Sequence, residues 1–382
     1  MEEELIYLDN AASSHPKPAA VYEASDRALR LGANPGRSGH KNALDAARLI
    51  HDTRELAAEL FNAEDSSSIV FTFNASHALN AAIFGYVNPG DHVITTAMEH
   101  NSVLRPLHAL SERGVRVTVV QADTEGWVDP KEIEEAMTGE TTLVCLTHAS
   151  NVCGTILDVK TVGEACRRRG VALLLDASQT AGTLKIDLAK LKVDMLAAPG
   201  HKGLLGPQGT GILYVRPGLE LRPFIFGGTG FHSEELKMPP KMPERLEGGT
   251  MNTPGIAGLG AGISYLLQRG VDNVRASEEL LTADLLDGLS AMDEVELYGP
   301  RDAARRVGVV SFNLRGKDGA HVGYVLDEAF SIGVRVGLHC APQAHRALGC
   351  YPSGTVRASV GPFTTAAHIE SLLYALRSII KI

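Results

Sequence analysis

A single lysine stands in a glycine-rich loop between two apolar runs. The loop, Ala198 to Gly211, contains Lys202, five glycines and two prolines, and residues 193–197 and 212–215 on either side are mostly apolar. A lysine in this place is either a surface turn residue or an amine held in apolar surroundings. A desolvated amine loses its proton more readily, so it can form a Schiff base with an aldehyde. The loop therefore makes Lys202 a candidate catalytic residue.

A carboxylate ends a second apolar run, upstream of this loop. Residues 171–175 are typical of a buried strand, and Asp176 and Gln179 follow them. An aldehyde cofactor such as pyridoxal 5'-phosphate (PLP) needs an acid that keeps its ring nitrogen protonated, and an aspartate at the end of a strand can do this. Lys202 and Asp176 together favour a PLP site over two unrelated structural residues.

The composition excludes several classes of function. The 382 residues include 36 basic and 45 acidic side chains, a formal charge of −9, and no basic block, which argues against nucleic acid as a partner. Five cysteines without Cys-x-x-Cys spacing favour a reducing, cytoplasmic setting. The acidic N-terminus lacks the pattern of a signal peptide and no apolar run reaches transmembrane length, so we expect no membrane association.

Strand-like and helix-like segments alternate along the first half of the chain. Strands are predicted over residues 68–73, 91–95, 115–121, 142–147 and 171–176, and helices over residues 18–31, 44–61, 102–110, 130–137 and 162–169. This order predicts an α/β fold with a doubly wound, mostly parallel sheet. Ligands of such sheets bind at the carboxyl ends of the strands, where His100, Asn151, Asp176 and Gln179 fall.

A small polar helix start follows the first of these strands. Residues 74–80 open a helix directly after the strand at 68–73. The free backbone N–H groups of such a helix start can bind an anion. The same residues also suit an ordinary N-cap, so both interpretations stay open here.

The regular alternation ends after Lys202. Glycine- and proline-rich segments at 226–230 and 246–254 indicate loops, and the remaining helices and short strands suggest a smaller α+β unit. We predict three parts: an N-terminal segment (residues 1–14) that packs on the small domain, a large PLP-binding domain (15–254), and a small C-terminal domain (255–382).

Seven short motifs are spread over nearly the whole chain. They are Tyr7-Leu8-Asp9-Asn10-Ala11-Ala12, Met98-Glu99-His100, Ser150-Asn151-Val152-x-Gly154, Asp176-x-x-Gln179, Gly200-His201-Lys202, Arg335-x-Gly337-x-His339-Cys340 and Arg357-Ala358-Ser359. Their order resembles that of the class V aminotransferase and cysteine desulfurase family, which consists of fold-type I PLP enzymes. The last two motifs are similar to those of SufS-type desulfurases and selenocysteine lyases.

The resemblance implies a role for each matching position. Lys202 is implied to form the Schiff base with PLP, and His100 to stack on the cofactor ring. The other implied cofactor contacts are Asp176 at the pyridinium nitrogen, Gln179 at the phenolic oxygen, Ala75, Ser76, His77 and His201 around the phosphate, Asn151, and Thr250 donated by the neighbouring subunit of a homodimer. The implied substrate contacts are Asn151 and Arg357 on the carboxylate, with His40 and Arg335 at the mouth.

Cys340 is implied to take the sulfur of L-cysteine. The products are then L-alanine and a Cys340 persulfide, whose sulfur passes to an acceptor, as in iron–sulfur cluster assembly. Arg335 and His339 are predicted to lower the pKa of the Cys340 thiol and so favour the thiolate. The alternative is that Cys340 is a small buried hydrophobic residue.

Other functions remain open at this stage. A selenocysteine lyase or a class V aminotransferase would use the same Lys202 chemistry, the aminotransferase with Cys340 as a bystander. A non-catalytic carrier that only binds the cofactor would be expected to have a degraded site. A metal cluster of His339, Cys340, His345 and Cys350 fits no common zinc spacing, so no metal is predicted.

Three departures from the family pattern bear on cofactor affinity, on the sulfur acceptor and on the choice between cysteine and selenocysteine. Ala75-Ser76-His77 stands where the SufS branch has Thr-Thr-Glu. Pro199 stands where it has serine, which removes a hydroxyl and an N–H group. Residues 341–351, after Cys340, also differ from the SufS pattern.

Overall fold

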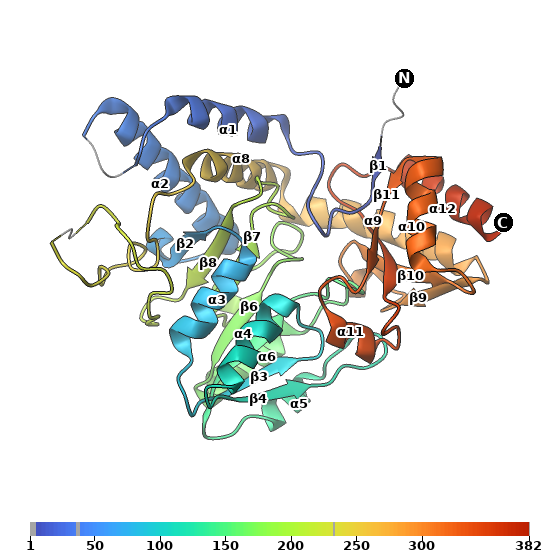
Figure 1. Ribbon diagram of the computed structural model, residues 1–382, viewed down its shortest axis with the longest axis horizontal. Helices are drawn as coiled ribbons and strands as arrows, with labels where there is room; N and C mark the ends of the chain where they lie inside the picture. The colour runs from blue at the N-terminus through green and yellow to red at the C-terminus, as the bar shows by residue number, and fades with distance from the viewer. Residues whose placement is uncertain (1–4, 36–38, 232–233, 382) are drawn as a thin grey trace.

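The computed structural model describes residues 5–35, 39–231 and 234–381. A seven-stranded sheet forms the centre of the larger part of the molecule, with the order β2-β8-β7-β6-β5-β3-β4 (Figure 1). The strands are β2 (Ile69–Thr72), β3 (His92–Thr96), β4 (Arg116–Val120), β5 (Thr141–Thr147), β6 (Ala172–Asp176), β7 (Met195–Pro199) and β8 (Gly211–Val215). β8 runs antiparallel to both of its neighbours, β2 and β7, and the other pairs of this sheet are parallel. The predicted α/β fold with a mostly parallel sheet is confirmed.

Alternate residues of the central strands enter two different cores. Leu173 and Leu175 of β6 pack in a core with α2, α6 and α8, whereas Ala172 and Leu174 pack on the opposite face with α3 and α4. Successive side chains of a strand point to opposite faces, and here both faces are covered by helices. This explains why the β6 segment is a continuous apolar run.

The helices that precede or cover this sheet are α1 (Ala19–Leu31), α2 (Lys41–Phe61), α3 (Ala75–Tyr86), α4 (Asn101–Ser111), α5 (Pro130–Glu135), α6 (Val159–Arg169), α7 (Leu188–Leu191) and α8 (Thr253–Arg269), with a 3₁₀ turn at Ser66–Ser68. Helix α8 packs against α1 and α2. The predicted boundary at residues 254 and 255 therefore falls inside α8, and the division into domains stays a prediction.

The C-terminal part contains a second, four-stranded antiparallel sheet with the order β12-β13-β10-β9. Its strands are β9 (Val295–Tyr298), β10 (Val309–Leu314), β12 (Arg335–Gly337) and β13 (Thr355–Ser359), and its helices are α9 (Val271–Ser290), α10 (Gly319–Phe330), α11 (Pro342–Ala347) and α12 (Ala366–Ile380), with a 3₁₀ turn at Ala303–Arg305. This part has its own apolar core.

The N-terminal segment joins the C-terminal part. Strand β1 (Ile6–Tyr7) pairs in parallel with β11 (Ile332–Gly333), and Leu8 is buried in the C-terminal core. The chain then crosses toward α1, which packs on α8 (Figure 1). Among the described residues, no helix is long and apolar enough to cross a membrane.

Candidate active site

The loop after β7 holds Lys202, and the N-terminal segment fixes its backbone. The carbonyl of His201 accepts from the Ser14 N–H (3.0 Å) and from Lys17 Nζ (2.8 Å), and Ser14 Oγ donates to the Lys202 carbonyl (2.8 Å). A Cβ added to Gly203 would lie 2.3 Å from the Ala181 carbonyl oxygen. Glycine is therefore needed for the loop to pack this closely on the segment that carries Gln179.

The amine of Lys202 lies in surroundings that weaken its charge. Lys202 as a whole is partly exposed, but its amine group is surrounded by protein atoms. This burial lowers the pKa of the amine to about 8. Asp176 acts in the opposite direction, since its negative charge favours the ammonium form. The amine can therefore give up its proton near neutral pH, as the sequence analysis required.

Asp176 lies at the carboxyl end of β6 and is buried. Both of its side-chain hydrogen bonds among the described residues reach Oδ1, from the Ser178 N–H (2.9 Å) and from the Ser178 hydroxyl. Oδ2 is left for another partner. Gln179 follows two residues later, and its Nε2 donates to the Ala11 carbonyl (3.2 Å).

His100 caps the N-terminus of α4 next to this carboxylate. Its Nδ1 accepts from the Ser102 N–H (3.0 Å). Burial lowers the pKa of His100 to about 4, which the negative charge of Asp176 opposes and the positive charge of Lys202 reinforces. His100 is therefore a neutral imidazole at physiological pH.

The start of α3 and His201 together offer polar groups that lack partners. Ala75 and Ser76 supply the first N–H groups of α3, which have no helix carbonyl to bond. Among the described residues, Nδ1 of His201 is buried without a hydrogen-bond partner. His77, which is also implied to contact the phosphate, stacks its ring on Phe73 (5.1 Å between centroids). Its Nδ1 accepts from the Phe73 N–H (3.2 Å).

Arg357 connects segments of the chain that are distant in sequence. It is 1 % exposed; its Nη2 donates to Asp9 Oδ1 (2.8 Å) and its Nη1 to the Asn151 carbonyl (2.9 Å). Nε of Arg357 is buried without a partner in the described part of the chain. Asn151 in turn donates from Nδ2 to the His339 carbonyl (2.7 Å), which ties the large sheet to the Cys340 loop.

Cys340 is exposed on the loop between β12 and α11. His339 and Cys340 both have left-handed backbone conformations, with φ of 48° and 59°, which non-glycine residues rarely adopt. The carbonyl of Cys340 accepts from the Asn101 N–H (2.8 Å), so the loop is held on the first turn of α4. Nη2 of Arg335 lies 3.9 Å from the Cys340 sulfur.

The expectation that His339 assists the Cys340 thiol is wrong. Its side chain is 3 % exposed and turns inward, where Nε2 bonds Thr355 Oγ1 (3.0 Å). Burial lowers its pKa to about 2, so His339 carries no charge that could stabilise a thiolate. Arg335 alone of the two predicted neighbours places a positive charge beside the sulfur.

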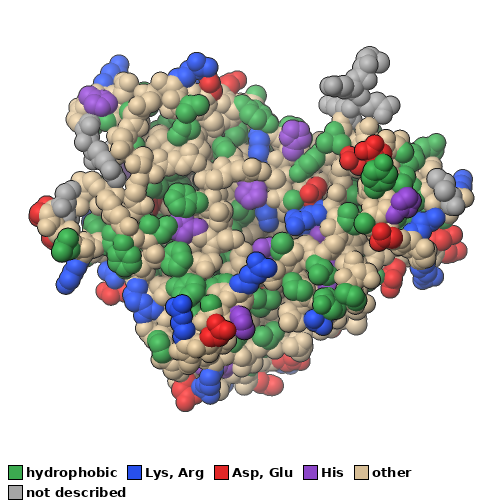
Figure 2. All heavy atoms as spheres, viewed as in Figure 1, with side chains coloured by type: hydrophobic (Ala, Val, Ile, Leu, Met, Phe, Trp, Pro, Cys, Tyr) green, Lys and Arg blue, Asp and Glu red, His purple; other side chains and the backbone are tan. Residues whose placement is uncertain are grey.

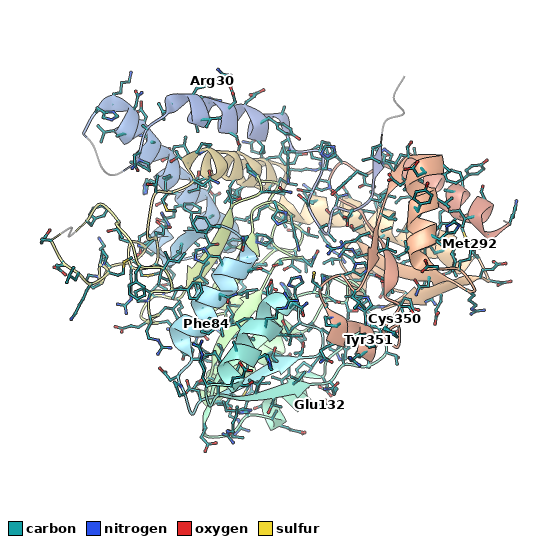
Figure 3. All side chains as sticks on the ribbon, viewed as in Figure 1. Arg30, Phe84, Glu132, Met292, Cys350 and Tyr351 are labelled. Atoms are coloured by element: carbon teal, nitrogen blue, oxygen red, sulfur yellow. The ribbon has the colours of Figure 1, made fainter. Side chains whose placement is uncertain are left out.

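Cys350 provides an internal comparison. It lies three residues after the end of α11, at the junction of the two parts of the molecule (Figure 3). Its side chain is buried, and this burial raises the pKa of its thiol to about 12. Cys350 is therefore a poor nucleophile, in contrast to the exposed Cys340.

The structure brings several of the predicted site residues together. Histidine and basic side chains collect near the middle of the face in Figure 2, between the large sheet and the C-terminal part. The residues linked there by hydrogen bonds or by electrostatic influence on one another are His100, Asn151, Asp176, Lys202, Arg335, Cys340 and Arg357.

Two predicted residues lie apart from this group within one chain. His40 caps the exposed start of α2, where its Nδ1 accepts from the Ala43 N–H (3.3 Å). Thr250 is exposed and lines a cavity of about 20 Å³ together with His77. The predicted roles of His40 at the substrate mouth and of Thr250 at a neighbouring subunit's site stay predictions.

Sequence reasoning missed several residues that hold the site together. Asp9 pairs with Arg357, Ser14 and Lys17 bind the Lys202 loop, and Ser102 bonds His100. Asp9 lies inside one of the seven motifs, which is the signal that could have marked it. The others carry no pattern of spacing that singles them out.

Comparison with known proteins places this geometry in a family. Residues 6–372 match the family described as aminotransferase class-V. A protein of Methanothermobacter thermautotrophicus named "Probable cysteine desulfurase" is 39% identical over 98% of this chain and 94% of its own length. The apo structure of a cysteine desulfurase from Thermococcus onnurineus NA1 has a TM-score of 0.93 and 35% identity, and covers 99% of this chain and 95% of its own.

A second solved structure is that of the cysteine desulfurase CsdA (S-sulfonic acid) from Escherichia coli, with a TM-score of 0.88 and 26% identity over 100% of this chain and 96% of its own. The family match and the likeness of these relatives thus extend over nearly all of the residues that build the site. This chain belongs to the class V aminotransferase family.

Proposed function

We propose that the protein is a PLP-dependent cysteine desulfurase that converts L-cysteine to L-alanine and receives the sulfur on Cys340. The observation that carries the proposal is the placement of an exposed thiol 3.9 Å from the Arg335 guanidinium, on a loop bound to the start of α4 beside His100. Relatives named cysteine desulfurase over nearly the full length of the chain support the same activity.

The residues around Lys202 fit the cofactor. Nδ1 of His201, which has no partner among the described residues, and the first N–H groups of α3 at Ala75 and Ser76 suit a phosphate. Oδ2 of Asp176 suits a protonated ring nitrogen, and Gln179 is held next to it. When bound, PLP supplies an aldehyde for amines and an electron sink for charge that develops at the substrate Cα.

Lys202 is the residue that moves protons in this proposal. With a pKa of about 8, its Nζ exchanges a proton readily near neutral pH, which suits a general base and acid. Burial is the main cause of this lowered pKa; the negative charge of Asp176 opposes it and the positive charge of Arg357 adds to it. The hydrogen bonds from Ser14 and Lys17 to residues 201 and 202 keep its backbone in place.

Arg357 and Arg335 suit the carboxylate of an amino-acid substrate. In the described part of the chain, Nε of Arg357 has no hydrogen-bond partner, while Asp9 and Asn151 fix the plane of its guanidinium. A buried guanidinium held in one plane recognises a carboxylate without a further loss of side-chain freedom. Arg335 is partly exposed on β12, nearer the Cys340 sulfur, and suits the mouth.

The sulfur step balances with Cys340 as the acceptor. The Cys340 sulfur attacks the sulfur of the substrate, the S–S bond forms, and the bond between substrate sulfur and Cβ breaks. The electron pair of that bond stays on the substrate carbon, which gains a proton and becomes the methyl group of alanine. The net change is L-cysteine plus a thiol giving L-alanine plus a persulfide, with no external oxidant.

The proposal extends to assembly and to the fate of the sulfur. Because Thr250 is exposed and lines a cavity that does not include Lys202, we propose a homodimer in which it completes the neighbouring site. Mixing Lys202→Ala and Thr250→Ala subunits should then restore part of the lost activity, and a fully active monomer would contradict this. We also propose that a protein acceptor takes the persulfide sulfur in the cytoplasm.

Product analysis of two cysteine variants tests the activity. Cys340→Ala should abolish alanine formation from L-cysteine, because the covalent route needs this nucleophile. Cys350→Ala is the matched control and should retain it, since the Cys350 thiol is buried and poorly ionised. Both variants should keep the near-visible absorbance of bound PLP, and mass spectrometry should find the extra sulfur on the Cys340 peptide of the wild type.

The other outcomes identify the alternatives. A keto acid in place of alanine would indicate an aminotransferase. Alanine from selenocysteine but not from cysteine, unaffected by Cys340→Ala, would indicate a selenocysteine lyase, because a selenol leaves without a thiol acceptor. If Cys340→Ala forms alanine from cysteine at the wild-type rate, the desulfurase proposal fails.

A further inference from the structure

Three side chains form a hydrogen-bonded chain from the start of α3 to His100. Ser76 Oγ lies 2.6 Å from Ser102 Oγ, and Ser102 Oγ lies 2.9 Å from Nδ1 of His100. The N–H of Ser102 points at the same Nδ1, at 3.0 Å. Ser102 therefore stands between a residue suited to bind an anion and the imidazole of the site.

The N–H of Ser102 decides the tautomer of His100. A backbone N–H can only donate, so the Nδ1 atom that it meets must be an acceptor. The single ring proton of neutral His100 then lies on Nε2. His100 is thus held as a donor at Nε2, the nitrogen that Ser102 does not bond.

The two hydroxyls can be arranged in two ways. In one, the Ser102 hydroxyl donates to Nδ1 of His100, and the Ser76 hydroxyl donates to Ser102. In the other, Ser76 donates its proton to an anion, and the Ser102 hydroxyl turns to donate to Ser76 Oγ. A phosphate oxygen without a proton only accepts, so an anion bound at Ser76 selects the second arrangement.

We propose that Ser102 is a positioning residue that couples anion binding at Ser76 to the hydrogen bonding of His100 Nδ1. With the anion bound, Nδ1 keeps the backbone N–H of Ser102 but loses its hydroxyl donor. The lone pair of Nδ1 then accepts one hydrogen bond instead of two, while the ring stays in the same tautomer and orientation. The proposal rests on the proposed function only in taking the cofactor phosphate as the natural anion.

Nitrogen NMR of the histidine rings tests the coupling directly. The sample is the full-length protein freed of cofactor, with ¹⁵N-labelled histidine, and His100→Asn assigns the His100 signals. We expect an unprotonated Nδ1 and a protonated Nε2 in the wild type. Addition of inorganic phosphate should shift the Nδ1 signal, and PLP should shift it in the same direction.

Variants of the serines separate coupling from general structure. Ser102→Ala should remove the phosphate-dependent shift of Nδ1 and weaken phosphate binding by about two- to tenfold, the effect of one hydrogen bond. Ser102→Thr keeps the hydroxyl and should restore the shift. Ser111→Ala is the control on the same helix, because its hydroxyl bonds the His108 carbonyl (2.7 Å) and lies outside the chain of contacts.

Three results would overturn the proposal. They are a protonated Nδ1 in the wild type, no phosphate-dependent shift in the wild type, and a shift that persists in Ser102→Ala. None of these measurements depends on turnover of cysteine. A failure of the desulfurase proposal would therefore leave the coupling intact, and a failure of the coupling would leave the desulfurase proposal intact.

Discussion

The pair of the buried Arg357 and the partly exposed Asp9 should contribute measurably to stability and to substrate binding. Asp9→Asn keeps the shape and an acceptor oxygen but removes the negative charge opposite a guanidinium that is 1 % exposed. A hydrogen bond to a charged group contributes about 1.5–3 kcal/mol, and a neutral one about 0.5–1.5 kcal/mol. Because Asp9 is 21 % exposed, water compensates part of the loss, and we expect about 1–2 kcal/mol of destabilisation.

Urea unfolding of matched variants measures this difference. Asp26→Asn is the control, because Asp26 and Arg30 form a pair with the same 2.8 Å separation on the outer surface of α1, where the side chains are 57% and 77% exposed. We expect no measurable change there. In the assay for alanine, Asp9→Asn should also raise KM for cysteine by about tenfold, since about 1.4 kcal/mol corresponds to that factor.

The result that refutes this reasoning is specific. If Asp9→Asn and Asp26→Asn unfold at the same urea concentration as the wild type, burial does not strengthen the Asp9–Arg357 pair. If stability falls but KM does not change, the pair is structural, and Arg357 does not bind the substrate carboxylate.

Two further predictions concern pH. The rate at which cofactor-free protein takes up PLP on Lys202 should rise with pH through about 8, where half of the amine is neutral, and level off above that pH as deprotonation becomes complete. Borohydride reduction and peptide mapping measure this rate, with Lys202→Ala as the control. A rate that still rises near pH 10 would contradict the lowered pKa. Glu99 is fully buried with a pKa raised to about 8, and its Oε1 accepts from Thr96 Oγ1 (2.8 Å) and the Thr147 N–H (2.9 Å). Since the folded state binds one proton more than the unfolded state between pH 4.5 and 8, Glu99 should make stability fall as pH rises through that window. Glu99→Gln should remove this slope in urea unfolding measured from pH 5 to 8, and equal slopes in both proteins would show that Glu99 is not the group responsible.

The sequence by itself determined the fold class and singled out Lys202 and Asp176 as candidates for a cofactor site, because both inferences depend on local pattern. Apolar runs that alternate with amphipathic segments report burial between two helical layers, and this predicted the mostly parallel sheet. A carboxylate at the end of such a run, as at Asp176, must lie at the carboxyl edge of the sheet. The glycine-rich loop marked Lys202 for the same reason, since its glycines permit close packing that larger residues would block.

Only the tertiary structure decided which contacts hold the site together and which side chains lie beside Cys340. Asp9 and Arg357 are 348 positions apart, and they meet because β1 pairs with β11 and carries the N-terminal segment across to β13. No local pattern predicts left-handed backbone at His339 and Cys340, because those residue types disfavour it; the fold imposes it, turning one side chain inward and leaving the other exposed. The contacts of Ser102 likewise depend on two helix starts that lie side by side at one sheet edge. Such contacts arise from the packing of segments distant in sequence, and the periodicity of any single segment contains no information about them.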